Sequence, residues 1–155
     1  HRELFQYGRF YCLAAPEADH GGSWMVVSKD RRRAAVLEMT GLLQPNASMP
    51  PLRLAGLEET YCYQVSLRQQ SVELDSFRTL LNHVLPLKLK ADGMLVHLAG
   101  ELYQMPCEQI TFTASGDLLM HAGLRPPQRF CGTGYTDGVR PMPDFSARIW
   151  LLESN

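Results

Sequence analysis

Short apolar runs separated by turn-forming residues make up most of this chain, which is the pattern of a β-rich protein. Two of them, 24–28 and 34–39, flank a charged turn and predict a β-hairpin. Further runs with strand character are 52–54, 61–65, 94–98, 110–113, 118–122 and 146–153. The last run is apolar on both faces, because Ile149 and Leu151 alternate with Trp150 and Leu152. It therefore predicts a central strand that is covered on both sides.

Two segments depart from this pattern and predict helix. Apolar residues at spacings of three and four predict one short amphipathic helix over 77–85, which Pro86 ends. Residues 1–7 have the mixed charged and apolar character of a helix end, with Gly8 as the C-cap. Since this helix has no capping residue at its start, we expect residues 1–7 to be the tail of a helix from a longer protein.

Seven or eight short strands with little helix predict an all-β protein, an antiparallel β-sandwich. The chain has 155 residues, of which 45% are hydrophobic and 20% charged, and this composition fits one globular domain. No internal repeat is visible, and the alternation of strand and long helix that a parallel α/β fold needs is missing.

The charge pattern and the cysteines exclude several classes of function. The net charge is −1, and the basic cluster of Lys29 and Arg31–Arg33 predicts a solvated hairpin tip, so neither nucleic acid nor a membrane is expected as a partner. The cysteines show no metal-ligand spacing and are expected to be buried free thiols of a cytoplasmic protein: Cys12, Cys62, Cys107 and Cys131. The sequence predicts no metal and no cofactor.

The acidic residues and histidines that could act in catalysis are expected to have structural roles. A retaining glycosidase needs two carboxylates roughly 5 Å apart across the scissile bond. The candidates all fall at turns or just before strands, where they bond backbone N–H groups: Asp92, Asp117, Asp137 and Asp144. His97 and His121 lie in apolar runs and are expected to be ordinary hydrogen-bonded residues of strands. The sequence therefore predicts no catalytic residue.

Aromatic side chains offer one candidate for sugar contact. A sugar can stack its C–H face on an exposed aromatic ring. Tyr135 lies in a glycine-rich loop and is the weak candidate, whereas the aromatic residues inside predicted strands are expected to pack in the core. Those residues are Trp24, Tyr61, Tyr63 and Trp150.

Four blocks, in order along the chain, resemble one enzyme family. They read HRELFQYGRFYCL, SWMVVSKDRRRAAVLEM, QPNASMPPLRLAGLEETYCYQV, and SGDLLMHAGL followed by RFCGTGYTDGVRPMPDFSARIWLLE. Together they resemble the C-terminal region of bacterial α-galactosidases of glycoside hydrolase family 36. Two departures are the turn Gly56-Leu57-Glu58-Glu59, which lacks the family's proline, and the long segment 68–112.

The resemblance implies a role within a larger enzyme. Residues 11–155 would be the C-terminal β-sandwich, and residues 1–10 the end of the last helix of a catalytic barrel and its linker. The parent would hydrolyse terminal α-D-galactosides such as melibiose or raffinose with retention, using two aspartates of the barrel that have no match here.

The resemblance also implies how the domain would act. It would support the barrel, on which Leu4, Phe5 and Phe10 would dock, and support a homo-oligomer. The alternatives are a β-sandwich module that binds carbohydrate by itself and a module that only forms oligomers.

Overall fold

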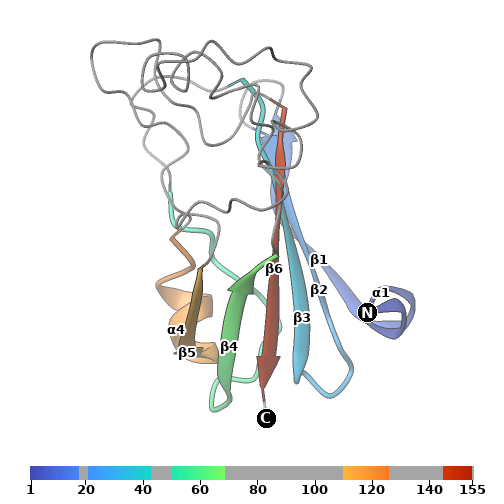
Figure 1. Cartoon of the computed structure of the whole chain (residues 1–155), viewed down its shortest axis with the longest axis vertical. Coiled ribbons are helices and arrows are strands. Elements are labelled where there is room, and N and C mark those ends of the chain that lie inside the picture. The colour runs from blue at the N-terminus through green and yellow to red at the C-terminus, as the bar shows by residue number, and fades with distance from the viewer. Residues whose placement is uncertain (18–20, 43–49, 69–109, 126–144, 155) are drawn as a thin grey trace, which may run out of the picture.

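The computed structural model describes residues 1–17, 21–42, 50–68, 110–125 and 145–154. They form an antiparallel sheet of six strands and two short helices (Figure 1). The elements are α1 (Arg2–Tyr7), β1 (Arg9–Glu17), β2 (Gly21–Val27), β3 (Arg33–Met39), β4 (Cys62–Leu67), β5 (Thr111–Ser115), α4 (Gly116–His121) and β6 (Ala147–Ser154). The mostly antiparallel β architecture and the helix at the N-terminus are confirmed.

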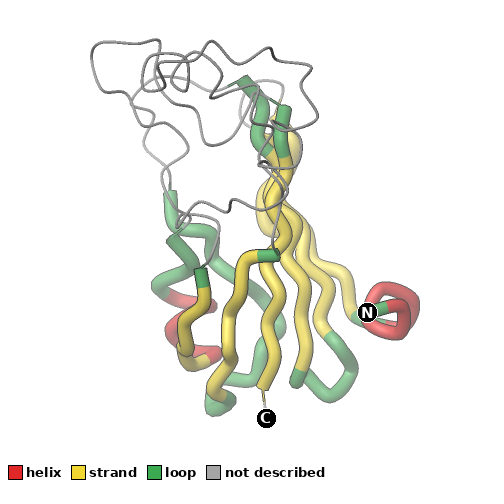
Figure 2. Tube along the Cα trace, in the orientation of Figure 1, coloured by secondary structure: helices red, strands yellow, loops and turns green. Residues whose placement is uncertain are grey.

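The strand order across the sheet is β1-β2-β3-β6-β4-β5. β6 is the last element of the chain, yet it lies between β3 and β4 and pairs with both. The prediction that 146–153 forms a central strand is therefore confirmed. In Figures 1 and 2 the two helices lie at opposite sides of the sheet, α1 beyond β1 and α4 beside β5.

The predicted hairpin at 24–39 is confirmed as β2 and β3, joined by the exposed basic turn. Hydrogen bonds hold this turn: the hydroxyl of Ser28 donates to the Asp30 carboxylate and accepts from the N–H of Arg33. Arg31 takes a left-handed backbone conformation, with φ at 58°. The basic cluster thus lies at a solvated tip, as predicted.

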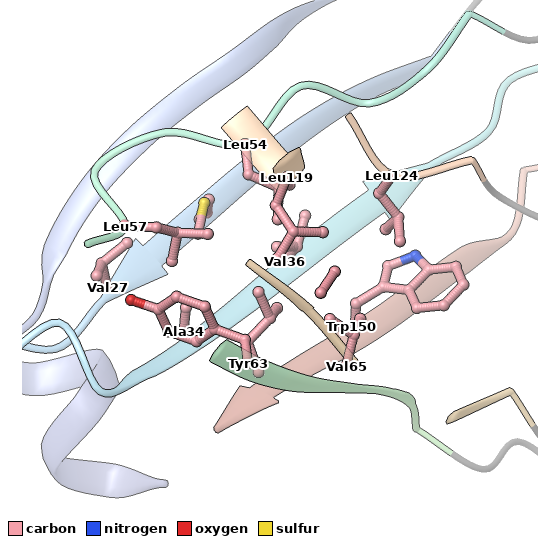
Figure 3. Close-up of a cluster of buried hydrophobic side chains, with 13 residues drawn as sticks. Val27, Ala34, Val36, Leu54, Leu57, Tyr63, Val65, Leu119, Leu124 and Trp150 are labelled. Atoms are coloured by element: carbon pink, nitrogen blue, oxygen red, sulfur yellow. The ribbon is translucent and has the colours of Figure 1, made fainter. Parts of the chain in front are cut away.

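One face of the sheet carries the hydrophobic core. A row of residues in register across five strands consists of Tyr11, Met25, Val36, Trp150 and Leu67. Segment 50–61 covers this face with Leu54 and Leu57, and segment 116–125 covers it with Leu119 and Leu124 (Figure 3). The side chain of Trp150 is wholly buried between these layers.

Two assignments from the sequence are wrong. Residues 118–122 were expected to form a strand, but 118–121 belong to α4 and Ala122 is its C-cap, because the hydroxyl of Ser115 starts a helix by accepting from the N–H of Leu118. Gly123, with φ at 83°, then ends the helix in the left-handed conformation that glycine adopts readily. Segment 52–54 forms only an isolated bridge, Leu52 with Leu124, instead of a strand.

A further strand, β1, was not predicted at all. Gly8 is the C-cap of α1, as predicted, because its N–H donates to the carbonyl of Leu4. Strand β1 starts at the next residue, Arg9. The register of β1 against β2 shifts between Cys12 and Ala14 and again before Glu17. These irregularities and Pro16 break the strict alternation that identifies a strand from sequence.

Several predictions lie outside the described residues. They are the helix at 77–85, the strand at 94–98 and most of the long segment 68–112, namely residues 69–109. The sandwich and the count of seven to eight strands therefore stay predictions, as does the division at residues 10 and 11. Among the described residues, no helix has the length and apolar character that a membrane span requires.

Candidate functional site

The acidic residue that sequence analysis singled out within the described residues has a local structural role. Asp117 lies in the first turn of α4, not before a strand, and its carboxylate is 3.0 Å from Nδ1 of His121. Both side chains are exposed. The expectation that His121 lies in a strand is wrong as well, because His121 is the last residue of α4. An acidic residue in the first turn and a histidine in the last turn are favourably placed in the helix dipole. Asp92, Asp137, Asp144, His97 and the sugar-contact candidate Tyr135 lie outside the described residues.

Other acidic groups are also held by neighbours. The hydrogen bond from Ser28 and the N–H of Arg32 lower the pKa of Asp30 below its ordinary value. The carboxylate of Glu58 lies 2.9 Å from the guanidinium of Arg31. In the described part of the chain, no group of three or more histidine, cysteine or acidic residues could hold a metal ion. These arrangements stabilise turns and caps and do not set up acid–base chemistry.

Tyr63 links the hairpin tip to the segment that covers the core. Its ring is wholly buried, and its hydroxyl donates to the carbonyl of Arg31 at 2.6 Å and accepts from the N–H of Glu58 at 3.0 Å. Burial raises the pKa of this hydroxyl, which keeps it neutral and able to donate. In the covering segment, Gly56 has φ at 72°, and a Cβ there would lie 2.2 Å from the hydroxyl of Tyr11, so this position requires glycine. Tyr63 therefore stabilises the joint between sheet and cover.

A second polar group lies in the core face and was missed by sequence analysis. Ser23, Glu38 and Arg148 are in register on β2, β3 and β6, and all three are buried. The indole N–H of Trp150 is 3.5 Å from the carboxylate of Glu38. A charged residue within each of two otherwise apolar runs, Glu38 and Arg148, is visible in the sequence, but their pairing across the sheet is not. Buried charges cost free energy unless they are paired, and Glu38 and Arg148 occupy paired positions of β3 and β6.

The described residues form a shallow hollow of about 330 Å³ between α1 and the hairpin tip. It is lined by Glu3, Leu4, Tyr7, Gly8, Ser28, Lys29, Asp30 and Arg33. Its charges face one another: Arg33 lies 3.9 Å from Glu3, and the ammonium of Lys29 lies 5.8 Å from the centre of the Tyr7 ring. The hollow therefore lies where α1 meets the hairpin tip, with these two contacts across it.

The two described cysteines differ from their prediction. Cys12 on β1 and Cys62 on β4 are free thiols, but both are exposed instead of buried. They fall on the face of the sheet opposite the core, because their neighbours Tyr11 and Tyr63 point into the core. Cys107 and Cys131 lie outside the described residues.

That opposite face, which we call the back face, carries exposed apolar residues. Phe10 on β1 is 62% exposed and Met39 on β3 is 42% exposed. Helix α1 adds Phe5 at 60% and Tyr7 at 58%. Its Leu4, by contrast, is only 2% exposed, so the expectation that Leu4 docks on another domain is wrong. Further exposed apolar side chains lie elsewhere among the described residues: Leu42, Phe112, Leu118 and Phe145.

Comparisons with known proteins identify the family of this chain. Residues 22–152 match the glycosyl hydrolase family 36 C-terminal domain. A stretch of 64 residues, 41% of this chain, is 39% identical to the α-galactosidase AgaA of Geobacillus stearothermophilus and spans 9% of that protein. The chain therefore belongs to the family of glycosyl hydrolase family 36 C-terminal domains.

Solved structures extend the match over nearly the whole chain. The family 36 α-galactosidases AgaB and AgaA of Geobacillus stearothermophilus each match 99% of this chain at 25% identity, with TM-scores of 0.58 and 0.59. The α-galactosidase of Lactobacillus brevis shares the fold at 23% identity and a TM-score of 0.58. The chain covers only 14% of each of these proteins.

Proposed function

We propose that this chain is the non-catalytic C-terminal domain of an α-galactosidase. The match to family 36 C-terminal domains over residues 22–152 carries this proposal. The intact enzyme hydrolyses terminal α-D-galactosides such as melibiose or raffinose. One solved structure is of a doubly substituted variant of AgaA of Geobacillus stearothermophilus in complex with raffinose, which supports this choice of substrate class.

The catalytic carboxylates belong to the catalytic barrel and not to this domain. A retaining hydrolysis needs a nucleophile and a general acid on either side of the glycosidic bond. The acidic residues described here serve other purposes: Asp30 holds a turn, Glu58 pairs with Arg31, and Asp117 lies in a helix first turn. These structural roles of the described acidic residues support a non-catalytic role for the domain.

The domain stabilises the catalytic barrel and, through it, an oligomer of the cytoplasmic enzyme. Its fold is completed as an antiparallel β-sandwich, with residues 1–10 as the link to the barrel and residues 11–155 as the sandwich. The exposed apolar residues of α1 and β1, Phe5, Tyr7 and Phe10, support contact with a neighbouring domain.

An aryl α-galactoside tests this proposal. The intact enzyme should release the aryl group, and the 155-residue chain should not. The change Asp117→Asn, made in the intact enzyme, should leave kcat and KM unchanged, because Asp117 only contacts His121 on the surface of α4. Turnover by the 155-residue chain that is lost in its Asp117→Asn variant would contradict a non-catalytic role.

A further inference from the structure

The tip of the β2–β3 hairpin, residues 28–33, contacts helix α1 on one side and the segment that covers the core on the other. Two of its four basic side chains face α1. The ammonium of Lys29 lies 5.8 Å from the centre of the Tyr7 ring, and the guanidinium of Arg33 lies 3.9 Å from the carboxylate of Glu3. The hollow described above separates the helix from the tip, and these two contacts cross it.

The other two basic side chains face the covering segment. The guanidinium of Arg31 lies 2.9 Å from the carboxylate of Glu58, and that of Arg32 lies 5.2 Å from the centre of the Tyr61 ring. The buried hydroxyl of Tyr63 adds a backbone link, because it donates to the carbonyl of Arg31 and accepts from the N–H of Glu58. The tip therefore holds the covering segment by side chains and by backbone.

Hydrogen bonds along the turn fix the backbone of the tip itself. The carbonyl of Ser28 accepts from the N–H of Arg31, and the carboxylate of Asp30 accepts from the N–H of Arg32. The carbonyl of Arg32 in turn accepts from the N–H of Ser154 at the end of β6. In Figure 1 this turn lies at the same end of the sheet as the C-terminus. With its backbone held at these points, we expect the turn to move as a unit.

Helix α1 depends on its neighbours, because a helix of six residues is not stable alone in water. Leu4 is buried, and Gly8 packs so closely on the end of β2 that a Cβ there would lie 2.6 Å from Cγ1 of Val26. The same end of β2 continues into the hairpin tip. A shift of the tip would therefore change the surroundings that keep α1 folded.

We propose that the hairpin tip couples α1 to the covering segment, so that loosening either element loosens the other. Exposed ion pairs and ring contacts contribute little singly. The coupling arises because one rigid turn carries both sets of contacts, and it acts in both directions. The inference goes beyond the proposed function and does not depend on it, since it concerns contacts among the described residues alone.

Hydrogen exchange measured by mass spectrometry on the intact enzyme tests the coupling. The change Tyr63→Phe removes the two hydrogen bonds that tie the tip to Glu58 and does not touch α1. Peptides that cover residues 1–8 should then exchange at least about threefold faster than in the wild type, because α1 opens more often when the tip is loose. Unchanged exchange in these peptides would overturn the inference.

A matched control separates coupling from a general loss of stability. Ser115→Ala weakens the cap of α4, which lies on the other side of the sheet from α1. It should leave the exchange of residues 1–8 at the wild-type rate. If Ser115→Ala and Tyr63→Phe accelerate this exchange equally, the effect comes from global unfolding and the inference is wrong.

A second pair of variants identifies the route. In an enzyme that carries Glu3→Gln and Tyr7→Ala, the two contacts from α1 to the tip are removed, and Tyr63→Phe should no longer accelerate the exchange of α1. In an enzyme that carries Phe5→Ala, another exposed position of α1, the acceleration by Tyr63→Phe should persist. Full acceleration in both backgrounds would show that the effect bypasses the tip contacts and would overturn the inference.

Discussion

The two faces of this sheet are built from the same strands but differ in what covers them. On the core face, Trp150, Tyr63 and Val36 are wholly buried under segments 50–61 and 116–125. On the back face, Phe10 and Met39 remain exposed although their strands are just as apolar. Alternation along a strand assigns a residue to a face, but only the cover decides whether that residue is buried. Among the described residues, burial therefore depends on which segments pack over a face as well as on how apolar its strands are.

The largest test of the comparison replaces one aromatic residue on each face. In the 155-residue chain, Trp150→Ala should lower the free energy of unfolding by about 3–5 kcal/mol, because it leaves a cavity in the core. Phe10→Ala should cost less than about 1 kcal/mol, since its side chain already meets water. Urea denaturation measures both. Equal losses would mean that Phe10 belongs to the core of this domain and would end the distinction between the faces.

A smaller effect is expected where the core face joins its cover. Tyr63→Phe removes the hydroxyl that bonds the carbonyl of Arg31 and the N–H of Glu58, and should cost about 1–3 kcal/mol. The matched control is Tyr7→Phe, which removes an exposed hydroxyl and should change stability by less than about 0.5 kcal/mol. The same urea titrations apply. A neutral Tyr63→Phe would indicate that the hairpin tip and segment 56–61 hold together without this link.

The helix over the core face should be sensitive to its cap. Ser115→Ala leaves the N–H of Leu118 without its acceptor and should cost about 0.5–2 kcal/mol. Ser115→Asp supplies another acceptor at the same position and should retain most of the stability. Thermal unfolding followed by circular dichroism compares the three proteins. If Ser115→Ala unfolds at the wild-type temperature, the burial of Leu119 alone holds α4 in place.

The smallest effect is expected at the hairpin tip, which belongs to neither face. The pKa of Asp30 is lower in the folded protein than its ordinary value of 3.8, so the unfolded chain takes up a proton first as the pH falls. The contribution of Asp30 is therefore present above pH 3.8 and is lost as the pH falls below it. Stability measured from pH 7 to pH 2 should fall slightly less steeply in Asp30→Asn than in the wild type. Parallel curves would show that Asp30 contributes nothing to folding.

Sequence reasoning was right where the period of the side chains was regular. The hairpin of β2 and β3, the strands β4 and β5, and the central place of β6 follow from apolar alternation and turn residues. It failed where two periods fit equally well. Five residues at 118–122 suit a strand or a helix, and the cap at Ser115 and the contact of Leu119 with the core decided for helix.

The candidate residues show a similar limit. Exposure of Cys12 and Cys62 could not be predicted, because thiols on the two sides of a strand look alike in sequence. The buried row of Ser23, Glu38 and Arg148 depends on register between strands that are far apart in the chain. Register is a property of the assembled sheet, so no local pattern predicts this row.

By itself, the sequence determined the β-rich class, the solvated basic tip and the resemblance to family 36 C-terminal domains, because these depend on local alternation and on the order of motifs. Only the tertiary structure decided which face of the sheet is covered. The reason is that segments 50–61 and 116–125 come from distant parts of the chain and pack on one side alone. Among the described residues, Phe10 and Met39 on the back face stay exposed, because neither of these two segments packs over that side.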